Sequence, residues 1–315
     1  MIHDCFTFAG EFDVLELRLE TLTGVVDRFV VAEGTRSFAG QPREVSELHA
    51  RVPARFRDRI VHLVVNELEA APQSAWHNEF RQRNALARGL VDAHPEDLLV
   101  LSDVDEIPHP DSVHRFRPGR YLSAVLHQRV FYYALNNELV GSGDKWELPW
   151  KAARVTTVRH FHRYYRTMQN LRRFGSEGRL PVTARRIDSL LLDRVTTQHL
   201  VPGGWHFTYL MAPAAIALKI AGFSHQEFNE DRYTDLEHLA RCVQSRIDPF
   251  GRERHFRVVD VQAGLPLPIQ REPERFRNWL VPNPDSASAV TGVGRAQRGE
   301  VAADPHVRRA PDEAE

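Results

Sequence analysis

The feature that most constrains the fold is a regular alternation of short apolar runs and amphipathic segments through the first hundred residues. Residues 2–8 are apolar-rich, and the apolar residues of the next segment, 12–22, recur at helical spacing. A second helical pattern covers residues 76–92, and further apolar runs, each typical of a buried strand, cover residues 25–32, 60–65 and 98–101. Repeated strand–helix units predict an α/β fold with a mostly parallel central sheet flanked by helices.

The rest of the chain is a mixed region followed by a polar tail. Strands are predicted at residues 121–126, 128–135 and 155–161, and helices return between residues 213 and 247. After Pro282 large apolar side chains are scarce, so this segment cannot bury enough surface to offset the entropy of ordering it. We therefore predict one domain, residues 1–283, and a disordered tail, residues 284–315.

Charge and composition exclude several classes of protein. The formal net charge is -1 over 315 residues, so no basic footprint for nucleic acid is expected. No run approaches ~20 apolar residues, which predicts no transmembrane helix, and no signal-peptide pattern opens the chain. The two cysteines, Cys5 and Cys242, are too few for a disulfide framework or a cysteine-rich zinc site. We expect a cytoplasmic protein.

Three carboxylates, Asp103, Asp105 and Glu106, directly follow the apolar run 98–101. Ligands of parallel sheets bind beyond the carboxyl ends of the strands. In an extended chain Asp103 and Asp105 point to the same side, where they repel each other unless a cation lies between them. Carboxylate oxygens select Mg²⁺ or Mn²⁺, which can bridge the phosphates of a nucleoside diphosphate and neutralise a leaving group. The alternative is a solvated acidic turn.

Several short motifs resemble those of one known family. In chain order they are IHDCF at 2–6, EFDVLELRL at 11–19, VAE at 31–33, QRNA at 82–85, SDVDEIP at 102–108 and GWHF at 204–207. Their number and order resemble glycosyltransferase family 17, which includes the β-1,4-mannosyl-glycoprotein N-acetylglucosaminyltransferases. The resemblance extends from the first residues to about residue 235.

This resemblance implies a GT-A type, Rossmann-like fold and transfer of a sugar with inversion. It implies a UDP-sugar donor (UDP-GlcNAc in characterised members), a carbohydrate or other hydroxyl acceptor, and dependence on Mn²⁺ or Mg²⁺. Residues 1–110 would then form the nucleotide-sugar-binding half and residues 111–283 the acceptor-side half. The chain departs from the animal enzymes because it shows no Golgi anchor, which leaves the acceptor open.

Four further residues are predicted to bind the donor or the metal. Arg83 provides a planar donor fork suited to phosphate or to Asp103, and Asn84 follows it. Glu33, after the second strand, is a candidate for the base or ribose. His206 follows two glycines that allow close backbone approach, and its imidazole can complete the metal sphere or touch the diphosphate. For each of them the alternative is an ordinary structural or surface role.

An inverting transfer also needs a base opposite the leaving group. We predict Glu227 as this base and Asp105 as the second catalytic carboxylate. The competitors for the base are Asp144, Glu147 and Asp231. Four aromatic residues are candidates for stacking on a sugar, with core packing as the alternative: Trp146, Trp150, Tyr132 and Tyr133.

Two other functions fit part of the pattern. A sugar nucleotidyltransferase also uses strand–helix units and metal-binding carboxylates, but it needs a basic, Gly-rich loop after the first strand, and residues 9–14 are acidic. A non-catalytic sugar-binding module is the other alternative, and the complete acidic cluster argues against it.

Overall fold

The computed structural model describes residues 1–143, 148–173 and 195–282. They belong to one compact unit, residues 1–282. The predicted tail at 284–315 and the candidates Asp144, Trp146 and Glu147 lie outside the described residues. Among the residues described, none of the helices has the length and apolar character that crossing a bilayer requires.

The described elements are mostly short. The strands are β1 (Ile2–Phe8), β2 (Arg28–Gly34), β3 (Ile60–Val65), β4 (Leu98–Asp103), β5 (Glu106–Pro108), β6 (Ser123–Tyr132), β7 (Asn137–Ser142), β8 (Arg154–Thr157), β9 (Thr197–Thr208) and β10 (Arg254–Val258). The α-helices are α1 (Phe12–Thr21), α2 (Leu48–Arg51), α3 (Ala54–Arg57), α4 (Ala75–Ala85), α5 (Pro110–His114), α6 (Val158–His160), α7 (Met168–Arg173), α9 (Pro213–Gly222), α10 (Asp231–Thr234), α11 (Leu236–Ser245) and α12 (Leu267–Arg271). The 3₁₀-helices are η1 (Leu86–Leu90), η4 (Gln226–Phe228) and η5 (Pro273–Trp279), and η2 (Phe161–Tyr165) is a π-helix.

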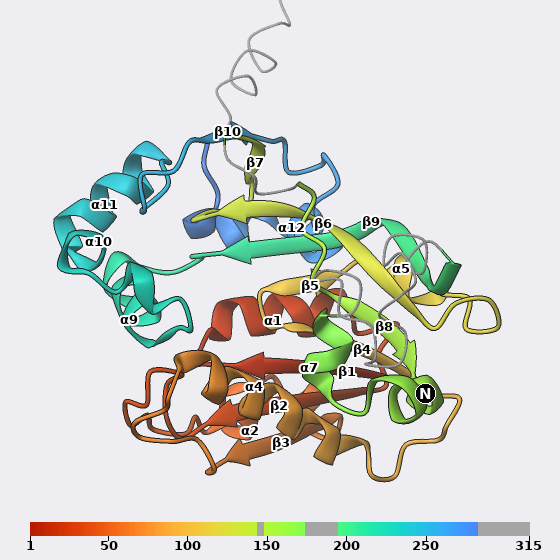
Figure 1. Cartoon of the computed structure of the whole chain (residues 1–315). Coiled ribbons are helices and arrows are strands. Elements are labelled where there is room, and N and C mark those ends of the chain that lie inside the picture. Colours follow the sequence, from red (N-terminus) through yellow and green to blue (C-terminus); the bar gives the residue numbers. More distant parts are fainter. Residues whose placement is uncertain (144–147, 174–194, 283–315) are drawn as a thin grey trace, which may run out of the picture. The chain divides into compact units, whose positions relative to one another are not determined.

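One sheet connects these strands in the order β10-β7-β6-β8-β4-β1-β2-β3, and β9 pairs with both β5 and β6. The first four strands are parallel, with β1 between β2 and β4, and Figure 1 shows β1, β2 and β3 pointing to the same side. β6 and β9 form a second parallel pair, whereas β8 runs antiparallel to both β4 and β6. The predicted α/β fold is therefore confirmed, with an antiparallel strand joining its two parallel parts.

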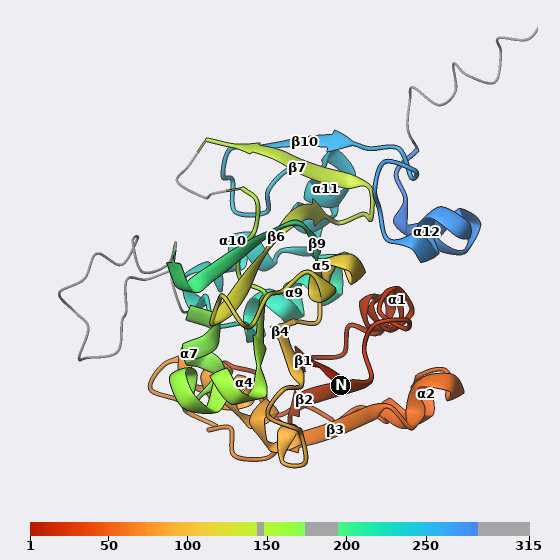
Figure 2. The ribbon, with the colours of Figure 1, turned by 90° about the vertical axis from the view of Figure 1, so that its right-hand side faces the viewer.

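Helices cover both faces of the parallel strands, as Figure 2 shows for α1 on one side and α4 and α7 on the other. Alternate residues of β4 point to opposite faces. Val100 packs in the cluster that contains α1, whereas Leu99 and Leu101 pack with η1 and α7. Both faces of β4 are therefore buried, which explains why four apolar residues follow one another there without a polar one between them.

Several predicted elements differ in extent from those observed. The helix predicted at 76–92 becomes a 3₁₀-helix at Leu86. The two strands predicted at 121–126 and 128–135 form the single strand β6. The strand predicted at 155–161 ends at Thr157. Its hydroxyl accepts a hydrogen bond from His160 N at 3.0 Å, so it caps a helix instead of continuing the strand.

Candidate active site

The acidic residues form a turn at the carboxyl end of β4. Asp103 is the last residue of β4, Val104 and Asp105 make the turn, and Glu106 begins β5. Val104 N donates to the carbonyl oxygen of Thr7 in β1 at 3.2 Å, and the Thr7 hydroxyl donates to Asp103 Oδ1 at 3.0 Å. The turn therefore lies at the edge where the parallel strands end, as the sequence predicts.

A buried arginine, Arg18 on α1, holds the backbone of this turn. Its guanidinium is 0% exposed and donates to the carbonyl oxygens of Asp103 (2.9 Å), Val104 (3.2 Å) and Glu106 (2.9 Å). The same group donates to both carboxylate oxygens of Asp4 at 2.8 and 2.6 Å. Because these bonds reach carbonyl groups, the shape of the turn does not depend on a bound ligand.

Asp103 and Glu106 share one cation, Arg172 at the end of α7. Arg172 donates to Glu106 at 2.5 and 2.6 Å and to Asp103 at 2.8 Å, and Arg83 NH2 lies 3.1 Å from Asp103. Burial by itself raises the pKa of Asp103, but Arg172 and then Arg83 hold that pKa well below its usual range. Trp150 Nε1 donates a further hydrogen bond to Glu106 at 2.6 Å.

Asp105 lies between a lysine and a histidine. Lys219 Nζ, on α9, donates to Asp105 Oδ2 at 3.0 Å, and His206 Nε2, on β9, lies 3.8 Å from Asp105 Oδ1. Burial raises the pKa of Asp105, but Lys219 and His206 together lower it below its ordinary value. The carboxylate is therefore ionised at neutral pH and faces two different nitrogen groups.

His206 reaches this position through a close approach of two strands. It pairs with Glu106 across β5 and β9, and a Cβ on the preceding Gly204 would lie 2.1 Å from Ile107 O. The close backbone approach expected of the two glycines is therefore confirmed. The His206 ring lies 4.9 Å from the Trp150 ring, and its buried Nδ1 has no hydrogen-bond partner among the described residues.

The predicted metal trio of Asp103, Asp105 and His206 is only partly brought together. Asp105 and His206 face each other, whereas Asp103 is turned toward Arg83 and Arg172. In the parts of the chain that the structure describes, no three His, Cys, Asp or Glu side chains are grouped closely enough to hold a metal ion by themselves.

Arg83 and Asn84 lie at the site, and both also fix α7. Arg83 NH1 donates to the side chain of Gln169 at 2.7 Å, and Asn84 Oδ1 accepts from Gln169 N at 3.0 Å. Since α7 ends with Arg172, these two residues help to place the cation shared by Asp103 and Glu106. Contact of Arg83 or Asn84 with a donor stays a prediction.

Glu33 is placed at the end of β2 but is only 1% exposed. Its carboxylate accepts from Ser46 N at 3.0 Å, from the Ser46 hydroxyl at 2.6 Å and from His62 Nε2 at 2.9 Å. Burial raises its pKa, and the bonds from His62 and Ser46 lower it below the ordinary value. Both oxygens are thus engaged within the protein, and a role toward the base or ribose stays a prediction.

Glu227 lies in η4, after α9, and its side chain is 58% exposed. Its carboxylate bonds to His225 Nδ1 at 2.7 Å. The competitor Asp231 is in the next helix, α10. Of the aromatic candidates, Trp150 borders the acidic turn, whereas Tyr132 and Tyr133 are buried in a core cluster with Tyr209 and Phe250.

Sequence reasoning identified Arg83 but missed three other cations of this site, Arg18, Arg172 and Lys219. Arg18 lies between apolar positions of the helical pattern at 12–22, yet its side chain is 0% exposed. A signal was available in Asp4, because an acid inside an apolar strand requires a buried partner. Arg172 and Lys219 lie 66 and 114 residues along the chain from their carboxylate partners, and no local pattern indicates either contact.

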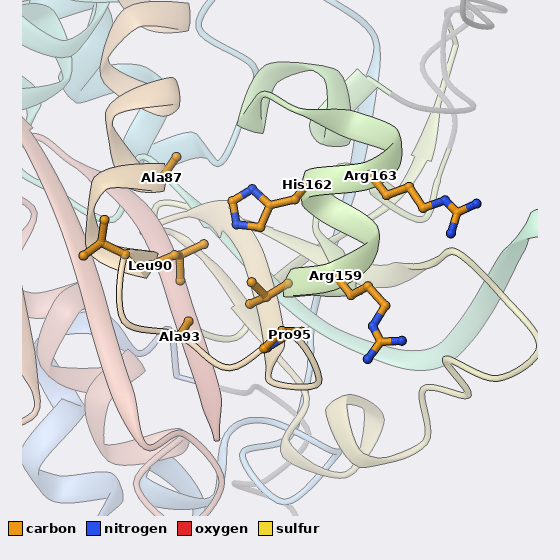
Figure 3. Close-up of a pocket in the computed structure, with 9 residues that line it drawn as sticks. Ala87, Leu90, Ala93, Pro95, Arg159, His162 and Arg163 are labelled. Atoms are coloured by element: carbon orange, nitrogen blue, oxygen red, sulfur yellow. The ribbon is translucent and has the colours of Figure 1, made fainter.

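A separate pocket of about 640 Å³ lies away from the acidic turn. Figure 3 shows His162 pointing toward Ala87 and Leu90, while Arg159 and Arg163 point away from them. Backbone bonds place this region beside Asp97 and Pro95, before the amino end of β4, whereas Asp103 is at the other end of that strand. Its lining contains no carboxylate and does not contribute to the acidic site.

Comparison with solved structures gives low similarity. The glucosyl-3-phosphoglycerate synthase of Mycobacterium tuberculosis aligns with a TM-score of 0.33 and 13% identity over 86% of this chain and 92% of that one. The glycosyltransferase GlyE of Streptococcus pneumoniae aligns with a TM-score of 0.31 and 10% identity over 63% of this chain and 45% of its own. Scores at this level do not establish a shared fold.

Sequence comparison is more informative. The chain is 23% identical to the human β-1,4-mannosyl-glycoprotein 4-β-N-acetylglucosaminyltransferase and 24% identical to the mouse protein of that name, in each case over 97% of this chain. It spans 59% of the length of these relatives. The model of glycosyltransferase family 17 matches residues 1–172, more than half of the chain, and this segment contains β1, β4 and the acidic turn. The chain therefore belongs to glycosyltransferase family 17.

Proposed function

We propose that the chain is a metal-dependent, inverting glycosyltransferase that transfers N-acetylglucosamine from UDP-GlcNAc to a hydroxyl group of a glycan or other acceptor. The observation that supports this most is the acidic turn at the carboxyl end of β4, with Asp105 facing both His206 and Lys219. The sugar and the nucleotide follow from family membership and from the names of the relatives.

The residues around Asp105 fit a Mn²⁺ or Mg²⁺ ion that is shared with a diphosphate. Two ligand atoms that each lie about 2.1 Å from one cation are separated by about 3 to 4 Å. Asp105 Oδ1 and His206 Nε2 are 3.8 Å apart, too far for a hydrogen bond but suitable for two ligands of one ion. Such ions are commonly bound by one or two protein groups together with substrate phosphates, so a third protein ligand is not required.

Side chains of the protein would then stabilise the charge on the leaving diphosphate and take the proton of the acceptor. The acceptor oxygen attacks the anomeric carbon, the bond from that carbon to the diphosphate oxygen breaks, and UDP leaves with the bonding electrons. A bound metal ion would offset charge on that diphosphate. Lys219, whose pKa is raised because Asp105 and Glu11 outweigh the effect of burial, adds a permanent positive charge beside it. A base of the chain takes the proton of the acceptor hydroxyl.

Incubation of the full chain with a panel of UDP-sugars tests this proposal. We expect release of UDP from UDP-GlcNAc in the presence of Mn²⁺, and background release in EDTA. Release of pyrophosphate from a nucleoside triphosphate and a sugar phosphate would instead identify a nucleotidyltransferase. Binding of sugars with no release of any nucleotide would identify a non-catalytic module.

Replacement of His206 by alanine tests the metal-binding pair. If His206 contacts the metal, His206→Ala should weaken UDP binding when Mn²⁺ is present and leave it unchanged in EDTA, as measured by calorimetry. The matched control is His109→Ala, because His109 also has a buried Nδ1 without a hydrogen-bond partner among the described residues but stacks on Trp205 instead of facing Asp105. An equal loss of affinity with and without metal would assign His206 a packing role.

A further inference from the structure

His225 and Glu227 form a hydrogen-bonded pair on the turn η4. Glu227 Oε1 lies 2.7 Å from His225 Nδ1. Burial raises the pKa of Glu227, but the hydrogen bond from His225 lowers it below the ordinary value, so the carboxylate is ionised and must accept. Nδ1 therefore donates its proton to Glu227, and the neutral imidazole has its lone pair on Nε2. The two side chains are 49% and 58% exposed, so the pair is accessible from solvent.

Three aromatic rings fix the orientation of this imidazole. The Trp76 ring meets it edge-on with centroids 4.7 Å apart, and the rings of Phe223 and Phe228 lie at 5.8 and 6.2 Å. A histidine held by three rings and a carboxylate is more ordered than an ordinary surface histidine.

The pair lies on the same side of the sheet as the acidic turn, because the same two helices reach both. On α9, Lys219 contacts Asp105, and His225 follows the end of that helix. On α4, Arg83 contacts Asp103, and Trp76, which packs on His225, is seven residues earlier. Seven residues of helix rise about 10 Å, so the pair stands on the order of 10 Å from the turn.

Contacts at the ends of β1 and β2 show that the His225–Glu227 pair lies beyond the carboxyl ends of these strands. The side chain of Gln82 donates to the carbonyl oxygens of Phe8 and Ala32, in β1 and β2, which places this part of α4 at their carboxyl ends. Trp76 precedes it and lies further out. The Gly222 carbonyl at the end of α9 accepts from Phe38 N in the loop after β2. Figure 1 shows α9 beyond the arrowheads of β1 and β2.

We infer that His225 is the general base for the acceptor and that Glu227 is its positioning residue, an assignment that rests on the glycosyltransferase function proposed above. The acceptor O–H bond breaks and its proton moves to His225 Nε2. The freed electron pair forms the new bond to the anomeric carbon as UDP departs. Glu227 keeps Nδ1 protonated, orients the ring and stabilises the imidazolium that forms. The sequence predicts Glu227 itself as the base, whereas its hydrogen bond to His225 favours the imidazole as the group that takes the proton.

A measurement independent of activity tests the pair itself. Nitrogen NMR of the full chain with labelled histidine should show His225 protonated on Nδ1 and unprotonated on Nε2 when the ring is neutral. Glu227→Ala should remove this preference. A neutral ring protonated on Nε2 in the unmodified chain would overturn the proposal, because that nitrogen could not accept a proton.

Kinetics test the role in catalysis. His225→Gln should reduce Mn²⁺-dependent UDP release from UDP-GlcNAc by at least about 100-fold, the low end of the effect of losing a positioned base. UDP affinity should not change, because the base contacts the acceptor. The pH profile of the remaining rate should also differ from that of the unmodified chain, because the proposed base is missing. Arg252 lies over the Phe228 ring and Arg173 lies over the Phe80 ring, which contacts Trp76, and both arginines stay charged at any pH used.

The chain offers a matched control in His255 and Glu253. They are also two residues apart and exposed, with His255 Nε2 3.2 Å from Glu253 Oε1, but they lie at the β10 edge of the sheet. His255→Gln should leave UDP release unchanged, and Glu227→Gln should give a loss smaller than that of His225→Gln. Full activity of His225→Gln would overturn this assignment while metal-dependent release by the unmodified chain upholds the proposed function. No release by the unmodified chain from any UDP-sugar would overturn both.

Discussion

Replacing Asp105 by asparagine should abolish Mn²⁺-dependent UDP binding and lower the rate of UDP release by about 10²–10³-fold, the typical cost of removing one preorganised charge-stabilising group. The amide retains the shape of the carboxylate but not its charge, so Lys219 and the proposed metal ion would lose the negative charge that they face at Asp105. Calorimetry with UDP, in Mn²⁺ and in EDTA, measures the first effect, and UDP release measures the second.

The fold should survive this change. Arg18 holds the turn through backbone carbonyls, and Glu11 Oε1 remains 3.6 Å from Lys219 Nζ as a second partner. The melting temperature in EDTA should therefore stay close to that of the unmodified chain. Asp111→Asn is the matched control, because this carboxylate is near the turn in sequence but 83% exposed. Undiminished UDP affinity of Asp105→Asn in Mn²⁺ would exclude the proposed metal site.

The second large effect concerns stability. Arg18→Met should lower the free energy of unfolding by about 3–5 kcal/mol, because breaking a buried ion pair leaves an uncompensated charge in the interior. Asp4 is 0% exposed and would lose both of its bonds to the guanidinium, and three carbonyl oxygens of the acidic turn would lose their donor. Urea denaturation followed by circular dichroism gives the difference.

Two further variants show whether the buried charge is the cause. Adding Asp4→Asn to Arg18→Met removes the stranded carboxylate and should restore part of the lost stability. Arg55→Met breaks an ion pair with Glu20 in which the arginine is 60% exposed, and it should cost no more than about 1 kcal/mol. A loss for Arg18→Met as small as that for Arg55→Met would contradict the structural role assigned to Arg18.

The amino-terminal half of the fold could be predicted from sequence because its signals are local. The apolar runs at 2–8 and 60–65 coincide with β1 and β3, and the helical pattern at 12–22 ends within one residue of α1. The run at 98–101 is buried on both faces, and the acidic residues after it lie where parallel strands end. Each inference required only the period of the apolar residues and the position of the polar ones.

The remaining part of the site depends on pairing between distant segments. His206 faces Asp105 because β9 pairs with β5, which is about a hundred residues earlier, and the Gly-Gly pair indicates close packing without naming the partner strand. Arg172 and Lys219 reach the turn from α7 and α9, whose sequences show ordinary charged residues. The link between His225 and Glu227 is local, yet nothing in the sequence shows that three rings fix the histidine.

Arg18 bonds to the backbone of the acidic turn, so the shape of the turn is determined separately from the chemistry of its side chains. Every amino acid has a carbonyl group, so the bonds to residues 103, 104 and 106 persist whatever side chains those positions bear. The backbone of the turn is held independently of the side chains that it carries. Replacing Asp105 by glutamate or histidine would change the length of the side chain and its chemical hardness as a metal ligand, while the backbone of the turn keeps its position. Single substitutions at this position would therefore test the cation preference of the proposed metal site without rebuilding the strand or the helix behind it.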